Sequence, residues 1–90
     1  NIKKRTFNFF EAYYSDNIDQ IYDFCVNNGI DYLVIDEKHF DEKYIKDGVY
    51  FEPFNSFVIR LTEGRDDFVL KNIPDAYKAY KEGSIFVIET

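Results

Sequence analysis

The sequence lacks methionine and tryptophan, and it contains one cysteine, two prolines and four glycines. Because Cys25 is the single cysteine, neither an internal disulfide nor a cysteine-based zinc site can form. The four glycines stand singly, so no glycine-rich loop is present to cradle the phosphates of a nucleotide. No serine lies in the G-x-S-x-G pattern of a nucleophile elbow. These absences argue against a nucleotide-dependent enzyme and against nucleophilic catalysis.

Positive charge is also scarce. The chain has 11 lysines and arginines against 17 aspartates and glutamates, which gives a formal net charge of -6. Proteins that bind nucleic acids need a positive surface to displace the counterions of the phosphates, and anionic lipid surfaces attract basic segments. We therefore expect no nucleic-acid partner and no peripheral attachment to an anionic membrane.

Long hydrophobic runs are missing as well. The longest runs of aliphatic and aromatic residues, 32–35 and 85–88, have four residues each, whereas a membrane-spanning helix needs about 20. We expect no direct membrane insertion of this segment, and no signal peptide is visible. Since the chain begins with Asn1 and has no methionine, we also expect that it was excised from a longer protein.

Apolar and aromatic residues, in contrast, are abundant. Hydrophobic residues make up 46% of the 90 residues and aromatic residues 20%, which is too apolar for a disordered chain. The length suits one core. We predict a single small α/β domain over residues 1–90, with about three strands and helices packed on the sheet in two or three layers.

The clearest helical pattern lies in residues 15–29. Ser15 or Asp16 is expected to cap the helix and Gly29 to end it. The strand predicted next, 31–36, is apolar at its centre on both faces, which is typical of a strand covered on both sides. In the helix predicted over 15–29, the apolar face consists of Ile18, Ile21, Tyr22, Cys25 and Val26, and Phe24 widens it.

The remaining elements are predicted from spacing and from glycine and proline positions. Short helical turns are expected over 40–46, ending at Gly48, and a weaker pattern indicates a helix over 3–14. For 54–63 we favour a helix with Pro53 at its first position, but the alternation of Phe57, Ile59 and Leu61 leaves a strand open. We also predict a strand at 67–71, a helix at 74–82 and a strand at 84–89. Parallel or antiparallel pairing of the last two strands stays open.

The densest polar cluster is residues 36–42, directly after the first predicted strand. His39 with Asp36 or Glu37 has the chemistry of a divalent-metal site or of an acid–base pair. An exposed, solvated loop is the alternative that we favour, because no H-x-x-H, H-E-x-x-H or EF-hand spacing is present. We therefore assign no catalytic, cofactor-binding or metal-binding residue, and no cofactor.

Eight tyrosines and ten phenylalanines raise the question of carbohydrate stacking. Phe51, Phe54 and the pair Tyr13–Tyr14 are the candidates. We favour the alternative that most of these rings fill the core of a small domain without methionine or tryptophan. Tyrosines in excess of the core then mark a surface for another protein.

Three segments together resemble a known type of protein. The stretches AYYSDNIDQIYDFCVNNGIDYLVIDEKHF, FEPF and GSIFVIET are similar to the soluble tail of polytopic bacterial membrane proteins of the GT-C glycosyltransferase type, and this resemblance covers Ala12 to Thr90. It implies a small extracytoplasmic α/β domain after many transmembrane helices. The catalytic acidic residues of that family lie in loops between early transmembrane helices, so the resemblance implies no catalytic residue here.

Three functions follow as hypotheses. The first is a non-catalytic accessory domain of a membrane-bound glycosyltransferase-like protein, whose partner is the parent membrane domain or another protein. The second is a cytoplasmic protein-interaction or regulatory module that dimerises through an aromatic face. The third is a small metal-assisted hydrolase that uses His39. The sequence leaves open the ligand, the partner, the oligomeric state and the side of the membrane.

Overall fold

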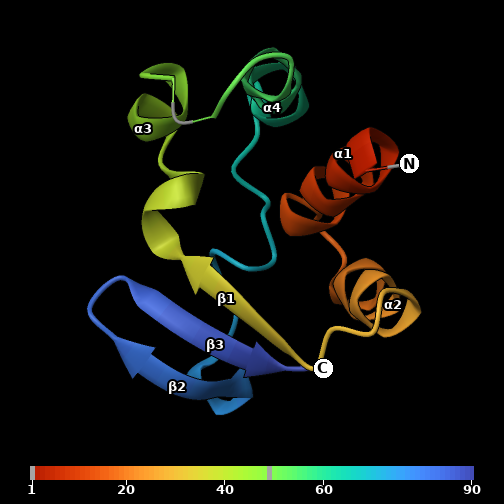
Figure 1. Ribbon diagram of the computed structural model, residues 1–90. Helices are drawn as coiled ribbons and strands as arrows, with labels where there is room; N and C mark the ends of the chain where they lie inside the picture. Colours follow the sequence, from red (N-terminus) through yellow and green to blue (C-terminus); the bar gives the residue numbers. More distant parts are fainter. Residues whose placement is uncertain (1, 49) are drawn as a thin grey trace.

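The computed structural model describes residues 2–48 and 50–90. It forms a small α/β domain in which four α-helices lie together on one side of a three-stranded sheet (Figure 1). This confirms the predicted fold class. In chain order the elements are α1 (Ile2–Tyr13), α2 (Ile18–Asn27), β1 (Tyr32–Asp36), the 3-10 turn η1 (Glu37–Phe40), α3 (Glu42–Lys46), α4 (Phe54–Thr62), the 3-10 turn η2 (Asp75–Tyr77), β2 (Lys78–Glu82) and β3 (Ile85–Glu89).

The sheet has the order β1-β3-β2 and is antiparallel throughout. The last two strands are joined by the two-residue turn Gly83–Ser84, in which Gly83 has a φ of +60°. A glycine at the first turn position with positive φ is typical of the tight turns that suit the twist of a hairpin. The pairing that the sequence left open, between strands predicted at 67–71 and 84–89, does not arise, because residues 67–71 form no strand. β3 pairs antiparallel with β1 and β2 instead.

The first strand is covered on one face only. Leu33 and Ile35 are buried, whereas Tyr32 and Val34 are 60% and 62% exposed. The prediction that both faces are covered is therefore wrong. An apolar run shows that a strand has two hydrophobic faces, but not that a second layer exists to cover both of them.

Two predictions for the second half of the chain are also wrong. Residues 67–71 form irregular backbone followed by a turn rather than a strand. Phe68 and Leu70 are buried as their alternation suggests, but the N–H of Val69 donates to the carbonyl of Ser15 at 2.9 Å instead of to a neighbouring strand. The alternation of apolar residues in 67–71 therefore indicated which side chains are buried, but it did not indicate a β-ladder.

The helix predicted over 74–82 is replaced by η2 and β2. The helical spacing that suggested it includes Tyr77 and Tyr80, which are exposed, and Ile73, which is buried. Pairing with β3 supplies backbone hydrogen bonds to residues 78–82. This tertiary pairing outweighs a weak local preference for a helix.

The remaining helices follow the prediction, with changes at their ends. α1 and α4 are helical, so the strand alternative for 54–63 is wrong, and Pro53 precedes α4 instead of occupying its first position. The predicted turns over 40–46 are divided between η1 and α3 by Asp41, whose carboxylate accepts the backbone N–H of Lys43. Gly48 has a φ of +83°, as a stop after α3 requires.

The second helix begins later than predicted. Its cap is Asn17, whose side chain accepts the N–H of Asp19 at 2.9 Å, and not Ser15 or Asp16. Ser15 instead receives the N–H of Asn17 and donates to Gln20. Gly29 ends the helix with a φ of +67°, as predicted. Val26, expected on the apolar face, is exposed.

Aromatic side chains form much of the core, as the sequence analysis favoured. Tyr13 and Tyr14 are 3% and 0% exposed, so neither ring is available to stack on a carbohydrate. Phe54 is half-buried against Phe7, and Phe51 is 89% exposed. The buried core consists of Phe10, Tyr13, Tyr14, Ile21, Cys25, Leu33, Ile35, Phe40, Ile45, Val58, Phe68, Leu70, Ile73, Phe86 and Ile88. Among the described residues, no helix is long and apolar enough to cross a membrane.

Candidate functional site

The structure joins the single histidine to three tyrosines from distant segments. Tyr13 and Tyr14 lie at the end of α1, His39 lies in η1, and Tyr50 lies in the loop before α4. We call these four residues the tyrosine–histidine cluster. Adjacent residues at a helix end point in different directions, so Tyr13 reaches the imidazole while Tyr14 reaches the backbone of His39 and the hydroxyl of Tyr50.

The hydroxyl of Tyr13 contacts both the imidazole of His39 and the backbone of Asp36. The Oη of Tyr13 lies 2.8 Å from Nδ1 of His39 and accepts the backbone N–H of Asp36 at 3.3 Å. Burial lowers the pKa of His39 and so favours its neutral form. In that form, Nδ1 accepts the single hydrogen of this hydroxyl. The imidazole is then neutral and carries its proton on Nε2.

The hydroxyl groups of Tyr14 and Tyr50 also have hydrogen-bond partners within the cluster. Tyr14 donates to the carbonyl of His39 at 2.9 Å, and the hydroxyl of Tyr50 donates to that of Tyr14, also at 2.9 Å. Each hydroxyl hydrogen of Tyr13, Tyr14 and Tyr50 thus has an acceptor. These hydrogen bonds connect the end of α1 to η1 and to the loop before α4.

Burial shifts the pKa values of these side chains so that their neutral forms are favoured. Desolvation lowers the pKa of His39, and the nearby charge of Asp36 opposes this effect only in part. Desolvation also raises the pKa values of Tyr13, Tyr14 and Tyr50 above that of a free tyrosine. At neutral pH the phenols therefore stay protonated, and His39 accepts a hydrogen bond as the neutral imidazole.

The side chains that the sequence placed in one candidate site point to different neighbours. The carboxylate of Asp36 caps η1 by accepting the N–H of Lys38 at 3.0 Å. Glu37 lies 3.4 Å from Lys81 and 3.8 Å from Lys78, on β2. His39 faces α1. Among the described residues, no group of three His, Cys, Asp or Glu side chains is arranged to hold a metal ion.

The burial of His39 predicts a pH dependence of stability. A histidine whose folded pKa is depressed takes up its proton more readily in the unfolded chain, so its contribution is complete above the ordinary pKa near 6.5 and is lost as the pH falls below it. We expect the free energy of unfolding to decrease below pH 6.5, by at most about 1.4 kcal/mol per pH unit from one such group.

Urea unfolding between pH 7.5 and 5 measures this slope, and His39→Gln provides the comparison. The substituted chain should show a shallower slope in that window, since Gln does not titrate. Identical slopes for both chains would show that His39 does not cause the pH dependence.

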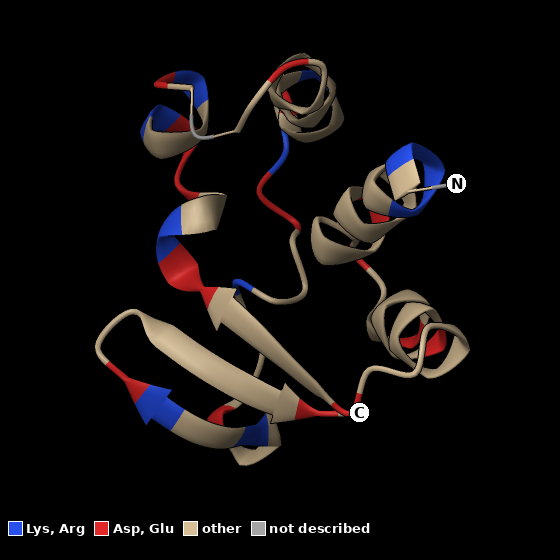
Figure 2. Ribbon diagram, viewed as in Figure 1, with Lys and Arg blue, Asp and Glu red and all other residues tan. Residues whose placement is uncertain are grey.

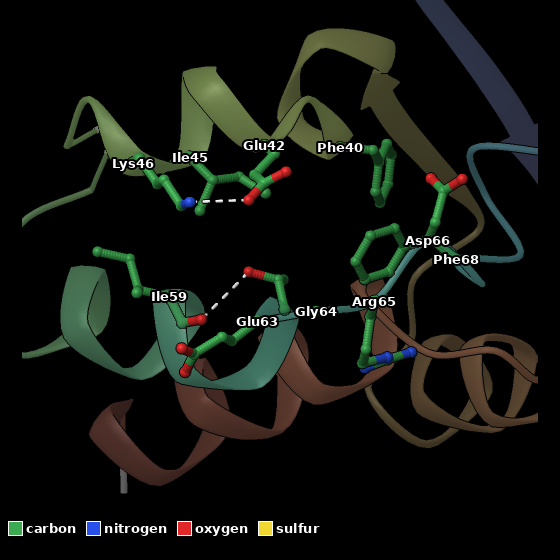
Figure 3. A pocket seen from close by; sticks show the side chains of 11 residues that line it. Phe40, Glu42, Ile45, Lys46, Ile59, Glu63, Gly64, Arg65, Asp66 and Phe68 are labelled. Carbon is green, nitrogen blue, oxygen red and sulfur yellow. Dashed lines mark hydrogen bonds and ion pairs between the residues drawn. The ribbon is translucent and has the colours of Figure 1, made fainter.

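A pocket of about 340 Å³ lies between α3 and α4, close to the cluster. Ile45 of α3 and Ile59 of α4 lie on its two sides, and Phe40 and Phe68 lie at one end (Figure 3). We call it the α3–α4 groove. The groove was not predicted from the sequence. The i, i+4 pair Glu42 and Lys46 is a signal for it, but such pairs are also common on exposed helices.

Charged side chains surround the mouth of the groove. Lys46 pairs with Glu42 at 2.7 Å, and this hydrogen bond, with the charges of Glu42 and Glu63, raises the pKa of Lys46. Arg65 points away from the groove (Figure 3), because its guanidinium bonds the carbonyls of Leu61 and Tyr14. Asp66, which also lines the groove, pairs with Lys71. The groove therefore has an apolar interior, and the carboxylates of Glu42 and Glu63 and the ammonium group of Lys46 lie at its mouth.

A third feature is the sheet face opposite the helices. Tyr32, Val34, Tyr80 and Ile85 on it are each at least 45% exposed, and Val87, which pairs with both Val34 and Tyr80, is half-buried between them. We call these five residues the open sheet face. β1 and β3 carry charge only near their ends (Figure 2), so the centre of this face is uncharged.

Comparison of the chain with protein-family models, curated proteins and solved structures gives no match.

Proposed function

We propose that this chain is a non-catalytic accessory domain of a membrane-bound glycosyltransferase-like protein, and that it contacts the rest of that protein through the open sheet face. The observation that carries the proposal is the exposed apolar row across all three strands, Val34–Val87–Tyr80, flanked by Tyr32 and Ile85. Adjacent exposed apolar side chains mark contact surfaces. The resemblance to the tails of GT-C-type proteins supports the identity of the parent.

The size of this face favours a partner in the same polypeptide. Three strands of five residues, spaced about 4.8 Å apart with a rise of about 3.4 Å per residue, cover roughly 240 Å². A stable complex of two separate proteins buries about 800 Å² on each partner. A tethered partner needs less area, because the tether provides a high effective concentration.

The same estimate weighs against the alternative of a dimeric interaction module. Two copies that meet through the open sheet face alone would bury well under half of a standard interface. The fully engaged hydrogen bonds of Tyr13 and Tyr14 also support a structural role of the cluster over turnover.

The encoding gene tests the identity of the parent. We expect several hydrophobic segments of about 20 residues in the coding sequence upstream of Asn1. A coding sequence without them would exclude a membrane-bound parent and favour the cytoplasmic module. In that case, a dimer in sedimentation experiments would support association through an aromatic face.

The contact itself can be measured by cysteine labelling in the full-length protein. Cys25 is buried, and burial raises the pKa of its thiol, so it should react slowly. In a Val34→Cys variant, we expect maleimide labelling about tenfold slower in the full-length protein than in the 90-residue chain, since docking worth about 1.4 kcal/mol reduces the open population tenfold.

The matched control is Phe51→Cys, at an exposed position outside the sheet. It should react at the same rate in both proteins. Equal labelling rates at position 34 would contradict docking through the open sheet face, whatever the gene encodes.

A further inference from the structure

The α3–α4 groove has the shape of a small-molecule site. Its volume of about 340 Å³ lies at the lower end of the range of roughly 300–1,000 Å³ that is usual for ligand pockets. Ile45 and Ile59 face each other across the groove, and the rings of Phe40 and Phe68 close one end (Figure 3). These rings are buried, with centroids 5.6 Å apart. The interior therefore suits an apolar chain or a single aromatic ring.

The charge at the mouth is unbalanced. Glu42 pairs with Lys46, whereas Glu63, on the other side of the groove, has no ion pair within 4 Å among the residues that the structure describes. Its charge nevertheless acts on Lys46. Glu42 and Glu63 thus share one ammonium group. The other two charged residues of the lining, Arg65 and Asp66, are paired with Asp67 and Lys71, so a net negative charge is left where a ligand would enter.

The other polar groups of the groove also favour a cation. Thr62 is buried and donates its hydroxyl hydrogen to the carbonyl of Val58 at 2.8 Å, so only its lone pairs can face a ligand. Glu63 follows the end of α4, where the carbonyls of the last helical turn carry partial negative charge. An anion would meet the ammonium group of Lys46, which already donates to Glu42. The guanidinium of Arg65, also in the lining, is held by the carboxylate of Asp67 and by two backbone carbonyls.

We propose that the α3–α4 groove binds a small organic ammonium ion with an alkyl or aryl tail. The tail lies between Ile45 and Ile59 and reaches Phe40 and Phe68. The ammonium group lies between Glu42 and Glu63, where it takes the place of Lys46. This inference is independent of the accessory role, because the groove and the open sheet face share no residue.

The test is an NMR titration of the 90-residue chain with three probes of similar size: phenethylammonium, 2-phenylethanol and 3-phenylpropanoate. We expect phenethylammonium to shift the amide signals of α3 and α4 and to bind at least about tenfold more tightly than the neutral alcohol, a difference of about 1.4 kcal/mol. The anion should bind most weakly. Equal affinities, tightest binding of the anion, or shifts confined to the sheet would overturn the proposal.

Substitutions at exposed positions test the assignment of charge. Glu63→Gln should weaken phenethylammonium binding several-fold, and Lys46→Gln should strengthen it, because the competing ammonium is removed. Glu89→Gln at the end of β3 is the matched control and should leave the affinity unchanged. Loss of affinity in Lys46→Gln, or no change in Glu63→Gln, would contradict the proposed position of the cation.

Discussion

Replacement of Phe68 by alanine should lower the free energy of unfolding by about 3–5 kcal/mol. The ring is 2% exposed and packs against Tyr14 and Phe40, with centroid distances of 5.7 and 5.6 Å. The guanidinium of Arg65 lies 4.9 Å from its centroid on the other side. Because these neighbours belong to the turn after α1, to η1 and to the loop after α4, truncation of the ring leaves a cavity where three segments meet.

The size of this effect is large for a small domain. A chain of 90 residues is expected to have a total stability of about 5–13 kcal/mol, so Phe68→Ala removes a substantial part of it. Urea unfolding followed by circular dichroism measures the loss. Phe51→Ala is the matched control, because that ring is 89% exposed, and it should change stability by less than about 0.5 kcal/mol. Similar losses in both variants would contradict the described packing.

Tyr13→Phe should cost about 1–3 kcal/mol, although it removes a single oxygen atom. That oxygen accepts the N–H of Asp36 and donates to Nδ1 of His39, so the substitution leaves two polar groups without their partner. The pKa of His39 should rise in this variant, because the neutral imidazole loses a hydrogen bond that favours it. NMR titration of the imidazole signals measures this change, and urea unfolding measures the stability.

Tyr80→Phe is the control for the tyrosine substitution. Its hydroxyl also donates to a side chain, that of Glu82 at 2.7 Å, but on the exposed sheet face. Water can replace this bond, so we expect a change below about 0.5 kcal/mol. An equal cost for both substitutions, or an unchanged pKa of His39 in Tyr13→Phe, would show that the buried hydroxyl does not hold the imidazole.

Local signals in the sequence were sufficient to predict several helices and strands. The apolar spacing before Gly29 identified α2, and the run 85–88 identified β3. Proline and glycine favoured α4 as a helix over a strand. The abundance of aromatic residues indicated an aromatic core. These signals are local because a helical face, a left-handed glycine and an apolar run each depend on neighbouring residues.

Only the tertiary structure decided which apolar side chains are buried against other segments of the chain. Phe68 and Leu70 are buried without forming a strand, and residues 78–82 form a strand despite their helical spacing. Val34 is exposed although it lies in the apolar run 32–35. The α3–α4 groove and the link from Tyr13 to His39, 26 positions apart, likewise require distant segments to meet. The sequence determined how much apolar surface each segment carries, but burial of that surface depends on what the rest of the chain places against it, which local periodicity does not encode.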